Sequence, residues 1–314
     1  MKRFAAILLS TAMLLALCAG CGAQSPVIDG EAAGTSGKEN ETAKTPAVQI
    51  EERFLNDPFE IHTPTTGDSQ EVDPGSTLAT WDLSRADNYP ADTECTDMQL
   101  FEKWMAVEGL TEEDLAKRGC RQLVLVAASQ GCEYLTSTIC LEQGDDGVWA
   151  PAAGFRRMIG YTGTNGINHD RVQGDVTSPA GLWQLGTCFG NDPMPEGLKM
   201  DWLDITPNSE WVGDNNSIYY NTWQELDDPD LEDSWDSDEG EHLEDYTNSY
   251  AYSCVIRFNM APYTRRNVGA AIFFHCSGGS TAGCIGLAKS EMKSVMLWMD
   301  PAMHPYILIT GYEQ

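Results

Sequence analysis

Short apolar runs separated by turn-forming residues dominate the second half of the chain. The clearest are "RQLVLVAAS" (121–129), "SYAYSCVIRFNM" (249–260), "GAAIFFHC" (269–276) and "PYILITGY" (305–312). They are rich in β-branched and aromatic residues and are bounded by Gly, Pro, Asn or Asp, which is the pattern of strands. A succession of such runs predicts a mainly β sandwich or barrel.

Two stretches have the apolar spacing of helices instead. In "DMQLFEKWMAVEGLTEEDLAKRG" (97–119), one face of a first helix collects Met98, Phe101, Trp104 and Met105, and "TEEDLAKRG" predicts a second short helix that ends at a glycine. We interpret residues 53–118 as a small helical extension packed on the main domain, 119–314.

Near the C-terminus, "SEMKSVMLWMDP" predicts a single helix whose buried side carries Met292, Val295, Met296 and Met299. Ser290 is the expected N-cap, and Asp300-Pro301 the expected end.

The N-terminus predicts export. Residues 1–20 combine a basic start with an apolar run and small residues before Cys21, as in a secretion signal. This arrangement resembles a bacterial lipoprotein cleavage box, which implies lipidation at Cys21 and an extracytoplasmic protein anchored to the cell membrane. An ordinary cleaved signal and an uncleaved anchor remain alternatives. Residues 21–52 have the composition of a flexible tether.

The formal net charge of −29 argues against nucleic acid as a partner. Much of it lies in 224–246, "QELDDPDLEDSWDSDEGEHLEDY", which lacks the spacing of a calcium loop. We interpret this segment as a solvated insertion, with weak calcium binding as the alternative. The sequence predicts neither a cofactor nor a bound metal.

Ten cysteines complete the composition. In an exported chain they are able to pair, but their connectivity does not follow from the sequence, and reduced buried thiols are the alternative.

The candidate chemistry lies in "AIFFHCSGGSTAGCIGL" (271–287). His275 ends a strand-like run, and Cys284 follows three small residues that allow close approach of a substrate and leave backbone N–H groups to act as donors. The stretch has neither a Gly-x-Ser-x-Gly elbow nor a phosphate-binding glycine pattern, and zinc ligation by His275, Cys276 and Cys284 lacks paired Cys-x-x-Cys spacing.

This stretch resembles the signature of the L,D-transpeptidase catalytic domain family (YkuD-like), with Thr281-Ala282-Gly283-Cys284 in place of its Ser/Thr-x-Gly-Cys motif. The likeness covers roughly 120–312. It includes "SQGCEYLTSTICLEQGDDGVW" (129–149) and "QGDVTSPAGLWQLG" (173–186) upstream, together with "WVGDNNSIYYN" (211–221) and "LWMDPAMHPYILI" (297–309), which are similar to an extracellular subgroup.

The resemblance implies an enzyme that cross-links peptidoglycan stem tetrapeptides through a thioester on Cys284. His275 would be the base that holds a thiolate–imidazolium pair, and Gly283 would shape the oxyanion site. Ser280, Thr281 and Ala282 would contact the substrate. Two alternatives stay open: an L,D-carboxypeptidase on the same scaffold, and a cell-wall-binding lipoprotein without catalysis.

The chain also departs from the family. The loop between His275 and Cys284 is short, Ala282 stands where many members have His or Lys, and Gly286 stands where many have Arg. The resemblance therefore requires another arginine for a substrate carboxylate. The candidates that we consider from the sequence are Arg257, Arg265 and Arg266.

Overall fold

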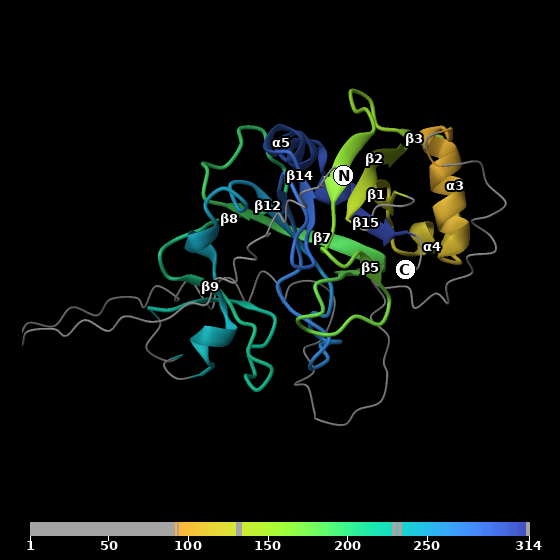
Figure 1. The fold of residues 1–314 in the computed structure, drawn as a ribbon. Helices are drawn as coiled ribbons and strands as arrows, with labels where there is room; N and C mark the ends of the chain where they lie inside the picture. The colour runs from red at the N-terminus through yellow and green to blue at the C-terminus, as the bar shows by residue number, and fades with distance from the viewer. Residues whose placement is uncertain (1–91, 93, 130–133, 228–230, 232–233, 312–314) are drawn as a thin grey trace, which may run out of the picture. The chain divides into compact units, whose positions relative to one another are not determined.

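A computed structural model describes residues 92, 94–129, 134–227, 231 and 234–311, which belong to one compact unit of the chain (Figure 1). The predicted signal peptide, the lipidation site at Cys21, the tether and residues 53–91 of the extension lie outside the described residues. Within them, no helix is both long enough and apolar enough to span a bilayer.

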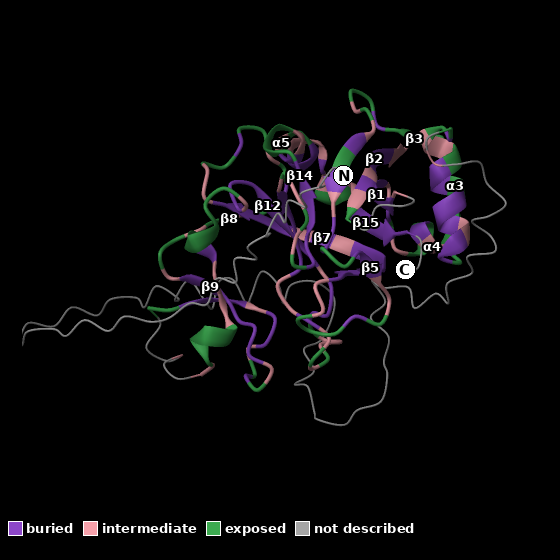
Figure 2. Cartoon of the chain, viewed as in Figure 1, coloured by how far each residue is buried: buried purple, intermediate pink, exposed green. Residues whose placement is uncertain are grey.

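The described part of the extension consists of the two predicted helices, α3 (Asp97–Val107) and α4 (Glu112–Lys117). Each begins at a threonine, Thr96 or Thr111, whose hydroxyl accepts a hydrogen bond from the N3 amide while the N3 side chain accepts one from the threonine N–H. The apolar face of α3 packs on the outer side of the sheet, where Leu123 and Leu308 belong to the same hydrophobic cluster. Figure 2 shows this division of α3 into a buried and an exposed face.

The main sheet closes into a β-barrel, which confirms the predicted mainly β class. Its strands run in the order β1-β15-β7-β12-β13-β14-β4-β2, and β1 also pairs with β2, so the sheet returns to its start. Strands β3 and β8 extend it at β2 and β7. The bounds are β1 (Gln122–Ala128), β2 (Leu135–Gln143), β3 (Trp149–Pro151), β4 (Met158–Tyr161), β7 (Gly181–Gly190), β8 (Trp202–Asp204), β12 (Ser253–Ile256), β13 (Phe273–Cys276), β14 (Ile285–Leu287) and β15 (Pro305–Thr310).

Five short strands form the smaller sheets of the described residues. A parallel pair consists of β5 (Ile167–Asn168) and β6 (Ser178–Pro179). A second sheet, in the order β10-β9-β11, contains β9 (Ser209–Trp211), β10 (Trp223–Glu225) and β11 (Glu241–His242). Short 3-10 helices lie at η2 (Ser237–Glu239), η3 (Leu243–Tyr246) and η4 (Pro301–Met303).

The C-terminal helix α5 (Lys289–Trp298) is present as predicted, and Met292, Val295, Met296 and Met299 are completely buried against the barrel. The predicted cap at Ser290 is wrong, because the helix begins two residues earlier than that cap implies. Ala288 is its N-cap and makes no side-chain capping bond, and Ser290 lies inside the first turn. The chain enters α5 straight from β14, so the position of that strand, and not a capping side chain, sets the start.

Candidate active site

One pocket of about 470 Å³ lies beside the β13–β14 junction. Its wall is formed by the segment 280–284, the approach to β13 at 269–272, the loop residues 171, 173 and 174, and parts of 239–250. Segments far apart in the sequence therefore meet here, and both His275 and Cys284 line the pocket.

The barrel brings the histidine and the cysteine together through two parallel strands. His275 lies in β13 opposite Gly286 of β14, and Cys284 immediately precedes β14. The side chains are almost buried, since His275 is 7% and Cys284 8% exposed. They share the pocket that the sequence led us to expect.

The Cys284 thiol is held by backbone groups. It donates to the Ala271 carbonyl at 3.3 Å and accepts from the Phe273 N–H at 3.3 Å. Burial raises the pKa of this thiol to about 12, and the nearby Glu241 carboxylate acts in the same direction, while the Phe273 hydrogen bond and the Arg171 charge oppose the shift. The thiol is therefore protonated at neutral pH.

The His275 ring is neutral as well. Its Nδ1 lies 2.9 Å from the Cys276 carbonyl, and because a carbonyl only accepts, the neutral ring carries its proton on Nδ1. Nε2 then has the lone pair that a general base needs. Burial lowers the pKa of His275 to about 4, although the Cys276 and Ser249 carbonyls oppose the shift.

Burial thus disfavours the thiolate–imidazolium pair that the resemblance implies. Forming it would place two charges in a buried site, and desolvation disfavours both of them. With the pKa of Cys284 raised and that of His275 lowered, the neutral thiol and neutral imidazole are favoured at pH 7, and a proton transfer between them would accompany the chemistry.

Thr281 closes the loop that precedes the cysteine. Its hydroxyl donates to the Cys284 carbonyl at 2.7 Å and accepts from the Gly283 N–H at 3.1 Å. Its backbone pairs with Thr162 and Thr164, and the Ser280 hydroxyl accepts a hydrogen bond from Thr164. Ser280, Thr281 and Ala282 all line the pocket as expected, but the Thr281 hydroxyl and the Gly283 N–H already have partners inside the loop.

Gly283 occupies a position that only glycine accepts easily. Its φ is +145°, and a Cβ there would lie 2.9 Å from the Thr177 carbonyl oxygen. The Ser178 hydroxyl also donates to the Gly283 carbonyl at 2.6 Å. The loop is therefore clamped tightly against 177–178, which fixes the backbone next to the thiol.

Position 286 has no room for the arginine that the resemblance led us to look for. A Cβ there would lie 2.5 Å from the Ser277 Cβ, so an arginine does not fit without movement of the neighbouring strand end. The three substitutes considered from the sequence are not among the pocket-lining residues, and Arg265 is exposed.

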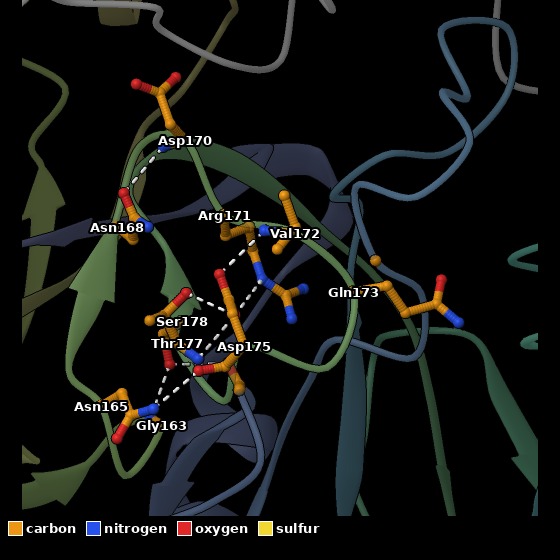
Figure 3. Close-up of polar contacts among 12 residues, drawn as sticks. Gly163, Asn165, Asn168, Asp170, Arg171, Val172, Gln173, Asp175, Thr177 and Ser178 are labelled. Atoms are coloured by element: carbon orange, nitrogen blue, oxygen red, sulfur yellow. Dashed lines mark hydrogen bonds and ion pairs between the residues drawn. The ribbon is translucent and has the colours of Figure 1, made fainter.

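The arginine in the pocket is Arg171, which sequence reasoning missed. It lies in the loop between β5 and β6, and Figure 3 shows its side chain running alongside Asp175 of the same loop. Only 6% of Arg171 is exposed. Its position in a polar, turn-rich stretch gave no sign of burial, because the residues next to its guanidinium, Phe258, Gly269 and Gly283, lie far along the chain.

The acidic segment is not simply a solvated insertion. Trp223, which precedes it by one residue, and Leu243 within it are buried, and Glu241 lines the pocket with a hydrogen bond from the Tyr250 hydroxyl. Burial raises the pKa of Glu241 to about 7, although that hydrogen bond opposes the shift. A carboxyl group that the sequence assigns to the surface thus belongs to the wall of the pocket.

Most of the described cysteines are free thiols. Cys120, Cys140, Cys188, Cys254, Cys276 and Cys284 are buried and form no disulfide, Cys95 is buried as well, and Cys132 lies outside the described residues. Within the same residues, no group of three or more His, Cys, Asp or Glu side chains is arranged to hold a metal ion. Part of the acidic segment, at 228–230 and 232–233, lies outside them.

No protein-family model matches the chain, and no curated protein or solved structure shows significant similarity to it. The fold and the pocket define the class of the protein as a closed β-barrel with a pocket whose wall contains a buried cysteine and a buried histidine.

Proposed function

We propose that the protein is a YkuD-like L,D-transpeptidase that acts on peptidoglycan stem tetrapeptides, exported and anchored to the cell membrane by lipid on Cys21. The observation that carries this proposal is the shared pocket. Cys284 and His275 come from adjacent parallel strands and line one cavity, with the motif 281–284 forming its wall.

The neutral resting state determines how the first step proceeds. The Cys284 sulfur attacks the carbonyl that joins a diamino acid to the terminal D-alanine, while Nε2 of His275 takes the thiol proton. The charge pair exists only while the new bond forms, so the free enzyme does not have to hold a desolvated thiolate.

The oxyanion needs a donor close to the sulfur. Because the Gly283 N–H is bound to the Thr281 hydroxyl, the Cys284 N–H is the donor that we assign to it. A well-placed donor of this kind contributes on the order of 3 kcal/mol to transition-state stability. Collapse of the intermediate expels D-alanine, whose amine takes the proton from His275 and leaves a thioester on Cys284.

The second step distinguishes transferase from hydrolase. The side-chain amine of another stem peptide attacks the thioester and loses its proton to His275, which forms a cross-link and regenerates the thiol. Water at the same position would give an L,D-carboxypeptidase. Incubation of the purified protein with tetrapeptide, with and without an amine acceptor, separates the two: we expect acceptor-dependent cross-linked product, and free tripeptide alone would favour the hydrolase.

The buried, neutral thiol also supports a cell-wall-binding protein without catalysis. Intact-mass analysis after exposure to a carbapenem tests this alternative. We expect an acyl adduct that disappears in Cys284→Ser, with Cys276→Ser as the matched control that keeps it. Complete absence of an adduct at high exposure would contradict the transpeptidase proposal. Membrane fractionation of Cys21→Ala tests the anchor, because unchanged retention would contradict lipidation there.

A further inference from the structure

The Arg171 guanidinium is buried without enough partners. Its side chain is 5% exposed, and its Nε and Nη1 atoms have no hydrogen-bond partner among the described residues. The nearest carboxylate oxygen, Oδ1 of Asp175, lies 3.8 Å from Nε, which is an ion-pair distance and too long for a hydrogen bond. Native proteins rarely leave such donors unpaired, so each one requires an explanation.

Asp175 does not fill this need because the loop itself uses it. Its carboxylate accepts hydrogen bonds from the Val172 N–H at 2.8 Å, from the Thr177 N–H at 2.9 Å and from the Thr177 hydroxyl at 2.8 Å (Figure 3). These bonds close the loop 172–177. The loop therefore holds the Asp175 carboxylate in a fixed position near the guanidinium. Asp175 supplies a negative charge there but no hydrogen bond to the Nε–H and Nη1–H groups of Arg171.

The rest of the protein makes room for the guanidinium at the pocket wall. A Cβ on Gly269 would collide with Nη1, and a Cβ on Gly283 would come within 3.3 Å of Nη2. The Phe258 ring lies 5.4 Å from the guanidinium carbon and supports it by a cation–π contact. Gly269, Gly283 and Arg171 all line the pocket.

Nη2 of Arg171 lies close to the residue that precedes the Cys284 thiol. Gly283 immediately precedes Cys284, so the guanidinium lies beside the backbone of the nucleophile. Of the described residues that line the pocket, Arg171 is the only lysine or arginine. A negatively charged ligand that reaches Cys284 therefore has one cation to bind.

We propose that Arg171 is the specificity-determining residue of this pocket and binds the free carboxylate of the ligand through paired N–H donors. The planar guanidinium fork matches a carboxylate and forms short, charge-assisted hydrogen bonds with it. The identity of the molecule that carries the carboxylate rests on the proposed function: it is the terminal D-alanine. That carboxylate lies one residue beyond the scissile carbonyl, and the Arg171 guanidinium lies beside Gly283, one residue before the nucleophile.

A binding experiment tests the carboxylate site independently of catalysis. The full chain with ¹⁵N-labelled arginine is titrated with N-acetyl-D-alanine and, separately, with its C-terminal amide, and the Nε–H resonance of Arg171 is assigned by its absence from Arg171→Lys. We expect a saturable shift with the acid and none with the amide. Equal responses to the two compounds, or none to either, overturn the proposal whether or not the protein is an enzyme.

A turnover experiment tests the same residue in the proposed reaction. With the wild-type protein, a tetrapeptide that ends in a carboxylate should have a kcat/KM about 10- to 150-fold higher than its C-terminal amide. In Arg171→Gln this ratio should fall to near one, and Arg171→Lys should restore part of it. Arg265→Gln, which removes an exposed arginine outside the pocket, is the matched control and should keep the full ratio.

The two experiments separate the possible failures. A normal acid-selective shift without turnover of either peptide would contradict the proposed function and leave the carboxylate site in place. Turnover that does not distinguish acid from amide would contradict the site and leave the function in place. If Arg171→Gln does not fold, as a thermal melt would reveal, the acid–amide comparison in the wild-type protein decides.

Discussion

The protonation state of Cys284 gives the sharpest quantitative prediction. Its pKa of about 12 lies about three units above the ordinary value of 9.0. Each unit changes the thiolate fraction tenfold, so at neutral pH this fraction is about 1000-fold lower than for an unperturbed cysteine. Iodoacetamide reacts with the thiolate, and this reaction does not require a general base. Alkylation of Cys284 should therefore be slow at pH 7 and should rise about tenfold per pH unit to pH 10 without a plateau.

The assay is peptide mass analysis of quenched samples across that pH range, with a free cysteine derivative in the same tube as the reference. Glu241→Gln should speed alkylation at every pH above 7, because the Glu241 charge helps to raise the pKa of the thiol. A plateau below pH 9, or a rate equal to that of the reference at pH 7, would refute this reasoning. Either result would mean that the thiolate–imidazolium pair exists before the substrate binds.

Three further predictions concern stability. The pKa of His275 is lowered from 6.5 to about 4, so between these pH values the unfolded chain binds a proton that the folded protein does not. The free energy of unfolding in urea should therefore fall by about 3 kcal/mol more from pH 7 to pH 4 in the wild-type protein than in His275→Asn. Parallel pH dependences for the two proteins would contradict this prediction. Gly283→Ala should cost about 1–3 kcal/mol of unfolding free energy because of its φ of +145°, and an unchanged thermal melt would contradict this. Met296→Ala should cost about 2–5 kcal/mol in the same measurement because Met296 is completely buried, whereas the exposed Ser294→Ala should cost almost nothing.

Local pattern was sufficient to predict the helices and four of the barrel strands. The strands β1, β12, β13 and β15 and the helices α3 and α4 fall within the stretches that their apolar spacing indicated, and α5 overlaps its stretch, because burial on one face of an element leaves a periodic trace in the sequence. The start of α5 was misplaced by two residues, since a serine in the right neighbourhood is only one of several ways to begin a helix.

The candidate site was only partly accessible to the same reasoning. His275 lies on β13 and Cys284 immediately before β14, the next strand, so their shared pocket followed from local structure. Arg171 and Glu241 come from a polar loop and an acidic segment, and no periodicity marks a charged side chain that tertiary contacts will cover. The shifts in the pKa values of Cys284 and His275 were inaccessible for the same reason, because desolvation depends on the whole pocket and not on the motif.

The closure of the barrel has a consequence for how the chain is made. Strand β1 pairs on one side with β2, which follows it directly, and on the other with β15, the last strand described, which also pairs with β7. A nascent chain released before Pro305 would present two unprotected strand edges, at β1 and β7, both able to recruit other polypeptides. Synthesis must therefore pass Thr310 before the barrel can close, and any chain that stops earlier keeps both edges open to aggregation.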